Sequence, residues 1–214
     1  MKKILLFAII GFTLFSCSND DDTYVEFEKS NYVLHHDETV QLKLNSSENT
    51  NLFTYYVNAP NVVKISSEGI AKGLYVGETP VVAKYGDLTA ECNVTVEPYV
   101  MLYRMIPLVT GGIDRATIKF LENAIDRDTL PAPMNMLVIA PAEEDTALDR
   151  LEYSFESTGL TSVSAFLKNT TGADKITLFM KERYPYREGA GYEDAGSGAK
   201  VRYIANGNKI EYTW

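Results

Sequence analysis

Hydrophobic residues follow three different patterns along the chain. Residues 4–15 form a nearly uninterrupted apolar run directly after Lys2 and Lys3. Residues 24–97 contain short segments in which apolar and polar residues alternate with a period of two, as in strands with one buried face. From residue 99 onward, stretches with helical spacing are interleaved with strand-like ones. The patterns therefore predict a leader, an all-β first module at 24–97 and a small α+β second module at 99–214.

The alternating segments of the first module predict a β-sandwich. One strand is expected around residues 40–44. A longer strand is expected at residues 88–96, with these residues facing the core: Leu88, Ala90, Cys92, Val94 and Val96. Gly86-Asp87 precedes this strand and predicts a two-residue hairpin turn, in which Gly supplies a positive φ. Glu97-Pro98 is the expected boundary of the module, because proline resists continuing a strand.

Two helices are expected in the second module. Residues 114–127 place apolar side chains on one arc, and Asp114 can act as the N-cap. The expected buried arc consists of Ile113, Thr117, Ile118, Phe120, Leu121, Ala124 and Ile125. A second helix can begin at Pro141, with three acidic residues in its first turn, and end at Gly159. A strand at residues 151–155 is the alternative for part of that segment.

Several strands complete the expected second module. The apolar run at residues 134–140 suits a buried strand, and residues 175–184 alternate like a strand. Residues 200–205 and 209–214 predict a hairpin around Asn206-Gly207-Asn208. Together these segments predict a mainly antiparallel sheet with two helices.

The apolar run at residues 4–15 predicts a cleaved leader. It is 12 residues long, whereas a membrane-spanning helix needs about 20 apolar residues. It therefore fits the central part of a signal peptide at residues 1–16. The residues that end it, Leu14-Phe15-Ser16-Cys17, resemble the lipobox of bacterial lipoproteins. This resemblance implies that Cys17 becomes the first mature residue and carries fatty acyl chains such as palmitate, which would hold the protein on a membrane.

Residues 18–22 form an acidic segment, Ser-Asn-Asp-Asp-Asp, directly after Cys17. Like charges in a row predict a solvated tether. The segment also resembles the surface-export tag of lipoproteins in some Gram-negative anaerobes. We expect an outer-membrane lipoprotein displayed at the cell surface, and an anchor that faces the periplasm is the alternative.

A second resemblance lies within the first module. Its features, in order, are a short strand at 62–65, the turn Ser67-Glu68-Gly69 that continues to Gly73, Gly77 before an alternating strand at 81–85, and a last strand at 90–96. This order resembles the bacterial Ig-like domain of group 2. The resemblance implies a stalk, a spacer or an adhesive module without catalytic residues.

Charge and cysteine content argue against nucleic-acid binding and indicate how the protein would contact a membrane. The chain has a formal net charge of −9, and loss of Lys2 and Lys3 with the leader makes the mature value −11. Such an acidic protein is a poor partner for nucleic acid, which is bound through Lys and Arg. Anionic lipid would repel it, so the acyl chains are the expected membrane contact. With Cys17 lipidated, Cys92 would be a lone thiol that packs as a small hydrophobic residue.

The residue types of the second module limit its chemistry. It contains no His and no Cys, which excludes Ser-His-Asp and Cys-His catalysis and His- or Cys-based zinc sites within it. The chain has no phosphate-loop or dinucleotide motif. Acidic clusters at 126–128 and 143–145 lack the spacing of a calcium loop. His35 and His36 suit a solvated loop better than a metal site, because adjacent side chains on an extended segment point apart. We expect no catalytic residue, metal site or cofactor.

The segment at residues 183–198 is the best candidate for ligand contact. Tyr184, Tyr186, Arg187 and Tyr192 are residue types that anchor interfaces, and the glycines between them would let a loop adapt to a glycan or protein ligand. A mobile hairpin loop without a partner is the alternative.

Three functions are consistent with these features. The first is a surface-anchored, non-enzymatic binding or adhesion accessory, in which the Ig-like module is a spacer and the second module recognises the ligand. The second is a structural subunit or assembly partner of an envelope complex. The third is a small hydrolase with paired carboxylates.

Overall fold

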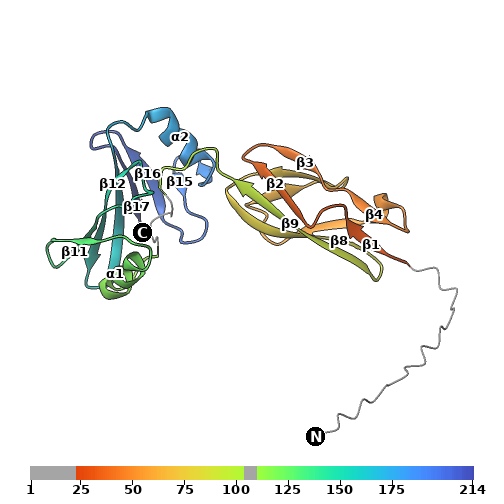
Figure 1. The fold of residues 1–214 in the computed structure, drawn as a ribbon, viewed down its shortest axis with the longest axis horizontal. Coiled ribbons are helices and arrows are strands. Elements are labelled where there is room, and N and C mark those ends of the chain that lie inside the picture. Colours follow the sequence, from red (N-terminus) through yellow and green to blue (C-terminus); the bar gives the residue numbers. More distant parts are fainter. Residues whose placement is uncertain (1–22, 104–109) are drawn as a thin grey trace, which may run out of the picture.

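The computed structural model describes residues 23–103 and 110–214. The expected signal peptide, Cys17 and the acidic tether lie outside the described residues. The chain is mostly β-structure, with antiparallel sheets and two α-helices, and it forms two bodies that meet beyond the end of strand β9 (Figure 1). Within the described part, no helix is long and apolar enough to cross a membrane.

Two sheets of the first module enclose one hydrophobic core. The strands are β1 (Val25–Phe27), β2 (Asn31–His35), β3 (Thr39–Gln41), β4 (Leu44–Ser46), β5 (Thr54–Val57), β6 (Val63–Ile65), β7 (Ile70–Gly73), β8 (Gly77–Tyr85) and β9 (Leu88–Glu97), with a short 3-10 helix η1 (Thr50–Leu52). One sheet has the order β2-β9-β8-β5 and the other β3-β7-β6, while β1 pairs with β4. The β2–β9 pair is parallel and the other pairs are antiparallel.

The hairpin predicted at Gly86-Asp87 is confirmed. Tyr85 pairs with Leu88 across the turn, and Gly86 has a φ of +57°, which a residue with a side chain adopts only at a cost. The inward face of β9 is buried as expected. Cys92 on that face is 3% exposed, and burial raises the pKa of its thiol to about 11, which makes it a poor nucleophile at neutral pH.

The prediction of one continuous strand at residues 40–44 is wrong. β3 ends at Gln41 and pairs with β7, whereas β4 begins at Leu44 and pairs with β1. Leu42 is fully buried at the break. The apolar residues of this segment alternate although the chain changes from one neighbouring strand to another within it.

One eight-stranded sheet and two helices form the second module. Its elements are α1 (Arg115–Asn123), β10 (Thr129–Leu130), β11 (Met136–Ile139), β12 (Leu148–Glu156), β13 (Gly159–Leu167), α2 (Ala173–Lys181), β14 (Tyr186–Arg187), β15 (Gly191–Glu193), β16 (Lys200–Ile204) and β17 (Lys209–Thr213). The sheet is antiparallel, with the order β10-β11-β12-β13-β17-β16-β15-β14. The strand expected at 134–140 is confirmed as β11, and the expected C-terminal hairpin is confirmed as β16 and β17.

The helix predicted from Pro141 to Gly159 is wrong, and the alternative strand is correct. β12 pairs with both β11 and β13. Its pairing with β13 shifts register between Leu148 and Arg150. This irregularity lets Leu148 and Leu151 both be buried at a spacing of three, which imitates a helix.

The strand predicted at residues 175–184 is also wrong, because α2 occupies Ala173–Lys181. Ile176, Leu178 and Met180 alternate in the sequence like residues of a strand. Ile176, Phe179 and Met180 are the residues that the helix buries, at the i, i+3, i+4 spacing of one helical face.

Helix α1 is confirmed and begins at the predicted cap. Asp114 Oδ1 accepts hydrogen bonds from the backbone N–H groups of Ala116 and Thr117, at 2.9 and 3.0 Å. The predicted buried arc is confirmed for Ile118 but wrong for most of its other members. The helix buries Ile118 and Glu122, while Phe120 is 73% exposed.

A buried ionic network explains the orientation of α1. Arg127 is 1% exposed, and its guanidinium donates to Glu122 Oε2 at 3.0 Å and to Asp145 Oδ2 at 2.7 Å. Tyr153 donates to the other oxygen of Glu122, and Asp145 also accepts the backbone N–H of Ala142 at 3.1 Å. Because a buried guanidinium needs carboxylate partners, Glu122 turns inward at the expense of the apolar residues beside it.

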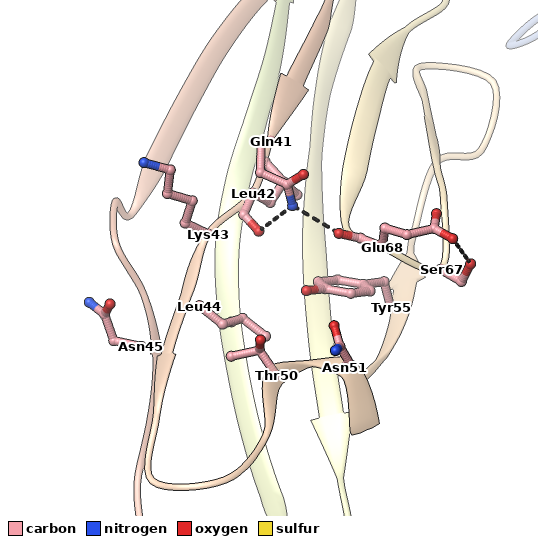
Figure 2. A pocket seen from close by; sticks show the side chains of 10 residues that line it. All are labelled: Gln41, Leu42, Lys43, Leu44, Asn45, Thr50, Asn51, Tyr55, Ser67 and Glu68. Atoms are coloured by element: carbon pink, nitrogen blue, oxygen red, sulfur yellow. Dashed lines mark hydrogen bonds between the residues drawn. The ribbon is translucent and has the colours of Figure 1, made fainter.

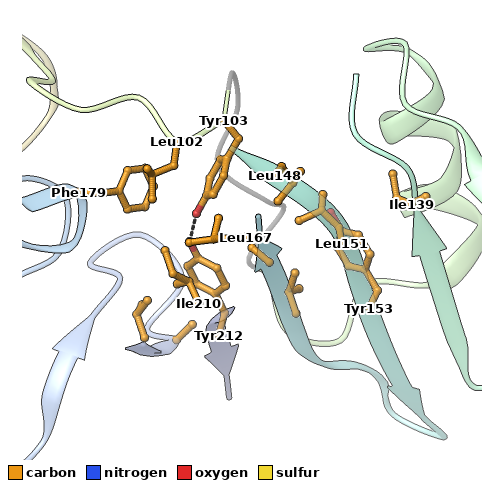
Figure 3. Close-up of a cluster of buried hydrophobic side chains, with 14 of the residues drawn as sticks. Leu102, Tyr103, Ile139, Leu148, Leu151, Tyr153, Leu167, Phe179, Ile210 and Tyr212 are labelled. Carbon is orange, nitrogen blue, oxygen red and sulfur yellow. Dashed lines mark hydrogen bonds between the residues drawn. The ribbon is translucent and has the colours of Figure 1, made fainter. Parts of the chain in front are cut away.

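Tyrosines occupy the centre of the second module's core. Figure 3 shows Tyr103 pointing toward Tyr212, and the two hydroxyl oxygens lie 3.0 Å apart. The Tyr184 hydroxyl lies 2.9 Å from the same Tyr212 oxygen. Burial raises the pKa of Tyr103 and Tyr212 well above the ordinary value, so these phenols stay neutral and hydrogen-bonded to one another.

Replacement of Arg127 by alanine should destabilise the second module by about 3–5 kcal/mol, because it leaves two buried carboxylates without their cation. Urea denaturation followed by tyrosine fluorescence measures the change. The matched variant Arg187→Ala removes an arginine that is 67% exposed and paired with Glu193, and it should cost at most about 1 kcal/mol. Equal losses in the two variants would contradict this account of α1.

Candidate functional site

Several hollows on the described surface are large enough for a small ligand, and two of them differ in the character of their lining. The first lies on the first module, where the chain passes from β3 to β4 (Figure 2), and measures about 400 Å³. Gln41 Nε2 donates there to the Glu68 carbonyl at 2.8 Å, and Ser67 Oγ donates to the Glu68 carboxylate at 2.9 Å. These polar side chains are thus already hydrogen-bonded within the first module.

The second hollow lies between the two modules and contains three of the sequence-predicted contact residues. We call it the junction hollow, and its volume is about 360 Å³. It is lined by His36 and Tyr75 from the first module and by Lys181, Tyr184, Tyr186 and Tyr192 from the second. Four of these six side chains are phenols, two are bases and none is a carboxylate.

The second module builds its side of the hollow from one helix end and one hairpin. Lys181 is the last residue of α2, and the chain then leads into the hairpin β14–β15. Tyr186 and Tyr192 are cross-strand partners in this hairpin, and their ring centroids lie 5.2 Å apart at an interplanar angle of 66°. The long loop predicted at 183–198 is therefore wrong in part, because strand pairing holds the two rings together.

The four predicted contact residues take different positions. Tyr186 is 64% exposed, and Tyr192 is half-buried beside it in the hollow. Tyr184 is 1% exposed and uses its hydroxyl in the tyrosine core, so only part of its ring reaches the hollow. Arg187 is not among the lining residues, and its guanidinium lies 3.3 Å from Glu193.

The first module contributes a histidine and a tyrosine that the sequence did not indicate as ligand contacts. The rings of His36 and Tyr75 are 6.3 Å apart. His36 Nδ1 contacts the Leu74 carbonyl oxygen, which can only accept, so this nitrogen carries the proton. His36 lies in the turn before β3, as predicted, but this contact leaves it only partly exposed, whereas His35 is the last residue of β2. Among the described residues, no group of three His, Cys, Asp or Glu could hold a metal ion.

Glu182 lies beside the hollow, where its buried carboxylate holds the start of the second module and its backbone carbonyl contacts the first. Glu182 Oε2 accepts the backbone N–H of Tyr99 at 2.9 Å, and Oε1 accepts that of Val100 at 3.2 Å. The Glu182 carbonyl accepts the N–H of Val76 in the first module at 2.8 Å. Arg183 pairs with the Glu182 carboxylate and donates to the Val100 carbonyl at 3.0 Å.

Tyr99 extends the junction over the surface of the first module. Its ring stacks on His35, with centroids 4.4 Å apart and an interplanar angle of 17°. Its hydroxyl donates to Glu38 Oε1 at 2.8 Å, while Glu38 Oε2 accepts the backbone N–H of His35 at 2.8 Å. The His35 N–H and then the Tyr99 hydroxyl lower the pKa of the Glu38 carboxyl.

Comparison with known proteins gives no family for the chain. No family model matches it, and no curated protein matches it. Among solved structures it is similar to domains 4–9 of the surface layer protein SbsC, with 13% identity and a TM-score of 0.30 over 88% of this chain and 26% of that chain. It is also similar to domains 5–6 of the S-layer protein SbsC, with 13% identity and a TM-score of 0.29 over 89% of this chain and 84% of that chain. The chain spans about a quarter of the first of these structures, and similarity at these scores supports no functional inference.

Acidification should weaken the contact between Glu38 and Tyr99. The folded-state pKa of Glu38 lies below the unfolded value of about 4.3, so its stabilisation is present above that value and is lost as the pH falls through the folded-state pKa. The melting temperature of Glu38→Gln should therefore lie below that of the unaltered chain at pH 6 and approach it below pH 4. A difference that stays constant over this range would contradict a role for the ionised carboxylate.

Proposed function

We propose that the protein is a lipid-anchored, non-enzymatic binding protein of the outer membrane, displayed at the cell surface. In this proposal Cys17 carries the lipid and the first module, residues 24–97, is a spacer of the bacterial Ig-like group 2 type. The second module, residues 99–214, recognises a glycan or protein ligand through the junction hollow.

The junction hollow is the observation that carries the proposal. It gathers aromatic side chains from both modules beside the end of α2, and its volume falls within the range of about 300–1,000 Å³ found for small-molecule sites. Tyrosine contributes a large contact area and loses little conformational entropy when it is fixed. Tyr186 is 64% exposed, so its ring is accessible to a ligand.

Two further features support the proposal that the first module is a spacer and the second a non-enzymatic recognition module. The core of the first module consists of residues between Phe27 and Val96, and that of the second consists of residues between Leu102 and Tyr212. The two buried clusters share no residue, as expected for a spacer and a recognition module. The hollow also lacks the paired carboxylates that a glycoside hydrolase would need, and this favours binding over hydrolysis.

Anchoring is tested by Cys17→Ser. The unaltered protein should fractionate with the outer membrane, carry acyl chains by mass spectrometry and be cut by proteinase added to intact cells. The variant should lose the acyl mass and leave the membrane fraction, because no other membrane contact is proposed. An unacylated mature protein, or one that keeps residues 1–16, would contradict the anchor.

Ligand binding is tested on arrays of glycans and of peptides with the mature chain and Tyr186→Ala. The variant should lose about tenfold or more in affinity for whichever ligand binds, because an exposed aromatic anchor is removed. Tyr56→Ala is the matched control, since Tyr56 is 54% exposed on β5 and does not line the hollow; it should bind normally. Binding that is equally strong in Tyr186→Ala would show that the hollow is not the site.

A further inference from the structure

We propose that the junction hollow binds an acidic sugar, meaning a sugar residue that bears a carboxylate or a sulfate, and that this sugar contacts both modules at once. The inference rests on the proposed function and names the ligand class of the same site.

The aromatic lining suits the face of a sugar ring. Tyr186 and Tyr192 meet at 66°, so they offer two differently inclined surfaces within one hollow. The π-face of an aromatic ring is electron-rich and attracts the polarised C–H groups on the face of a pyranose, in weak hydrogen bonds that add up over the ring. A sugar ring can therefore stack on one phenol and touch the edge of the other.

The phenol hydroxyls provide the polar contacts that a sugar also needs. Within residues 23–103 and 110–214, the hydroxyls of Tyr75, Tyr186 and Tyr192 make no hydrogen bond to protein. Each phenol can donate one hydrogen bond and accept others, which matches the donor and acceptor character of sugar hydroxyls. An apolar ligand would leave these hydroxyls without partners and lose affinity.

The charges around the hollow favour an anion. Lys181 lines the hollow and makes no ion pair with any described residue, and no carboxylate lines it. The C-terminus of α2 carries a partial negative charge of about one half, which the full charge of Lys181 outweighs. The nearby carboxylates have cations of their own: Glu193 is paired with Arg187, and Glu182 is paired with Arg183. Asp37, which lies 3.3 Å from His36 Nε2, is paired with Lys72 at 2.7 Å. A site of this kind is unusual in a chain with a net charge of −9, since the remaining surface repels anions.

The sheet edge beside the hollow argues against a peptide ligand. An extended peptide binds by adding a strand to an exposed edge. The edge strand here is β14, and it contains two residues, which is too short to pair with a peptide over a useful length. A sugar needs no such edge.

The hollow takes His36 and Tyr75 from the first module and its other lining residues from the second. A ligand that fills it therefore contacts both modules. Substitution of Tyr75 should weaken binding as substitution of Tyr186 does, although the two residues belong to different modules.

The experiment measures binding of the mature chain, solubilised in detergent, to an array of glycans that bear uronic acid, sialic acid or sulfate. The acidic glycan that binds best is then titrated by calorimetry beside its neutral counterpart, which is the methyl ester of a carboxylated glycan or the desulfated form of a sulfated one. Tri-aspartate serves as an acidic ligand without a sugar ring. We expect the acidic glycan to bind, its neutral counterpart to bind at least about tenfold more weakly, and tri-aspartate not to bind.

Three variants assign the contacts. Lys181→Gln should weaken binding of the acidic glycan about three- to tenfold and leave binding of the neutral counterpart unchanged. Tyr186→Ala and Tyr75→Ala should weaken binding of both about tenfold. Tyr56→Ala, with circular dichroism spectra for all variants, controls for loss of fold.

Each other outcome overturns the inference in a distinct way. Equal binding of the acidic glycan and its neutral counterpart, with no effect of Lys181→Gln, would show that the charge is not recognised. Binding of tri-aspartate would show that the sugar ring is not recognised. If only peptides bind in a Tyr186-dependent manner, the acidic-sugar inference fails while the proposed function stands. If no ligand of any class depends on Tyr186, both fail.

Discussion

The carboxylate of Glu182 is buried at the point where the two modules meet, and the geometry of the junction follows from the partners that it must have. A buried carboxylate without hydrogen-bond donors and a cation would cost several kcal/mol. Glu182 obtains its donors from the backbone of Tyr99 and Val100, the residues that follow the first module, and its cation from Arg183. The Glu182 carbonyl also accepts the Val76 N–H, so this one residue holds the start of the second module through its carboxylate and the first module through its backbone.

The candidate site depends on this contact. Lys181 precedes Glu182 and Tyr184 follows it closely, so the turn that carries the buried carboxylate also carries two lining residues of the junction hollow. Val76 lies next to Tyr75 and is held by the Glu182 carbonyl. The hydrogen bonds at Glu182 therefore also bring the aromatic rings of one module to those of the other. Figure 1 shows the end of β9 leading toward the body that contains α2. A ligand in the hollow would stabilise the same arrangement.

Structural features that depend on neighbouring residues could be predicted from the sequence. Features that depend on residues distant in the sequence could not. The hairpin at Gly86-Asp87 and the cap at Asp114 depend on residues within a few positions of one another, and both were predicted correctly. The inward turn of Glu122 depends on Arg127 and on Asp145, which lies 18 residues beyond Arg127. Three lining tyrosines were predicted as a ligand-contact group because they lie in one short segment. His36 and Tyr75 could not be added to that group, because only the packing of the two modules brings them to it.

The most direct measurement is backbone ¹⁵N relaxation of the mature chain in detergent, compared with that of the variant Glu182→Gln. In this variant an amide N–H₂ replaces one carboxylate oxygen, so a donor faces a backbone N–H that needs an acceptor. Glu188→Gln, at an exposed position of the β14–β15 turn, is the matched control. The account predicts that both modules share one rotational correlation time in the unaltered chain and in the control, and that the modules tumble with separate, shorter correlation times in Glu182→Gln. A shared correlation time that survives in Glu182→Gln, or independent tumbling in the unaltered chain, would contradict the role assigned to this carboxylate.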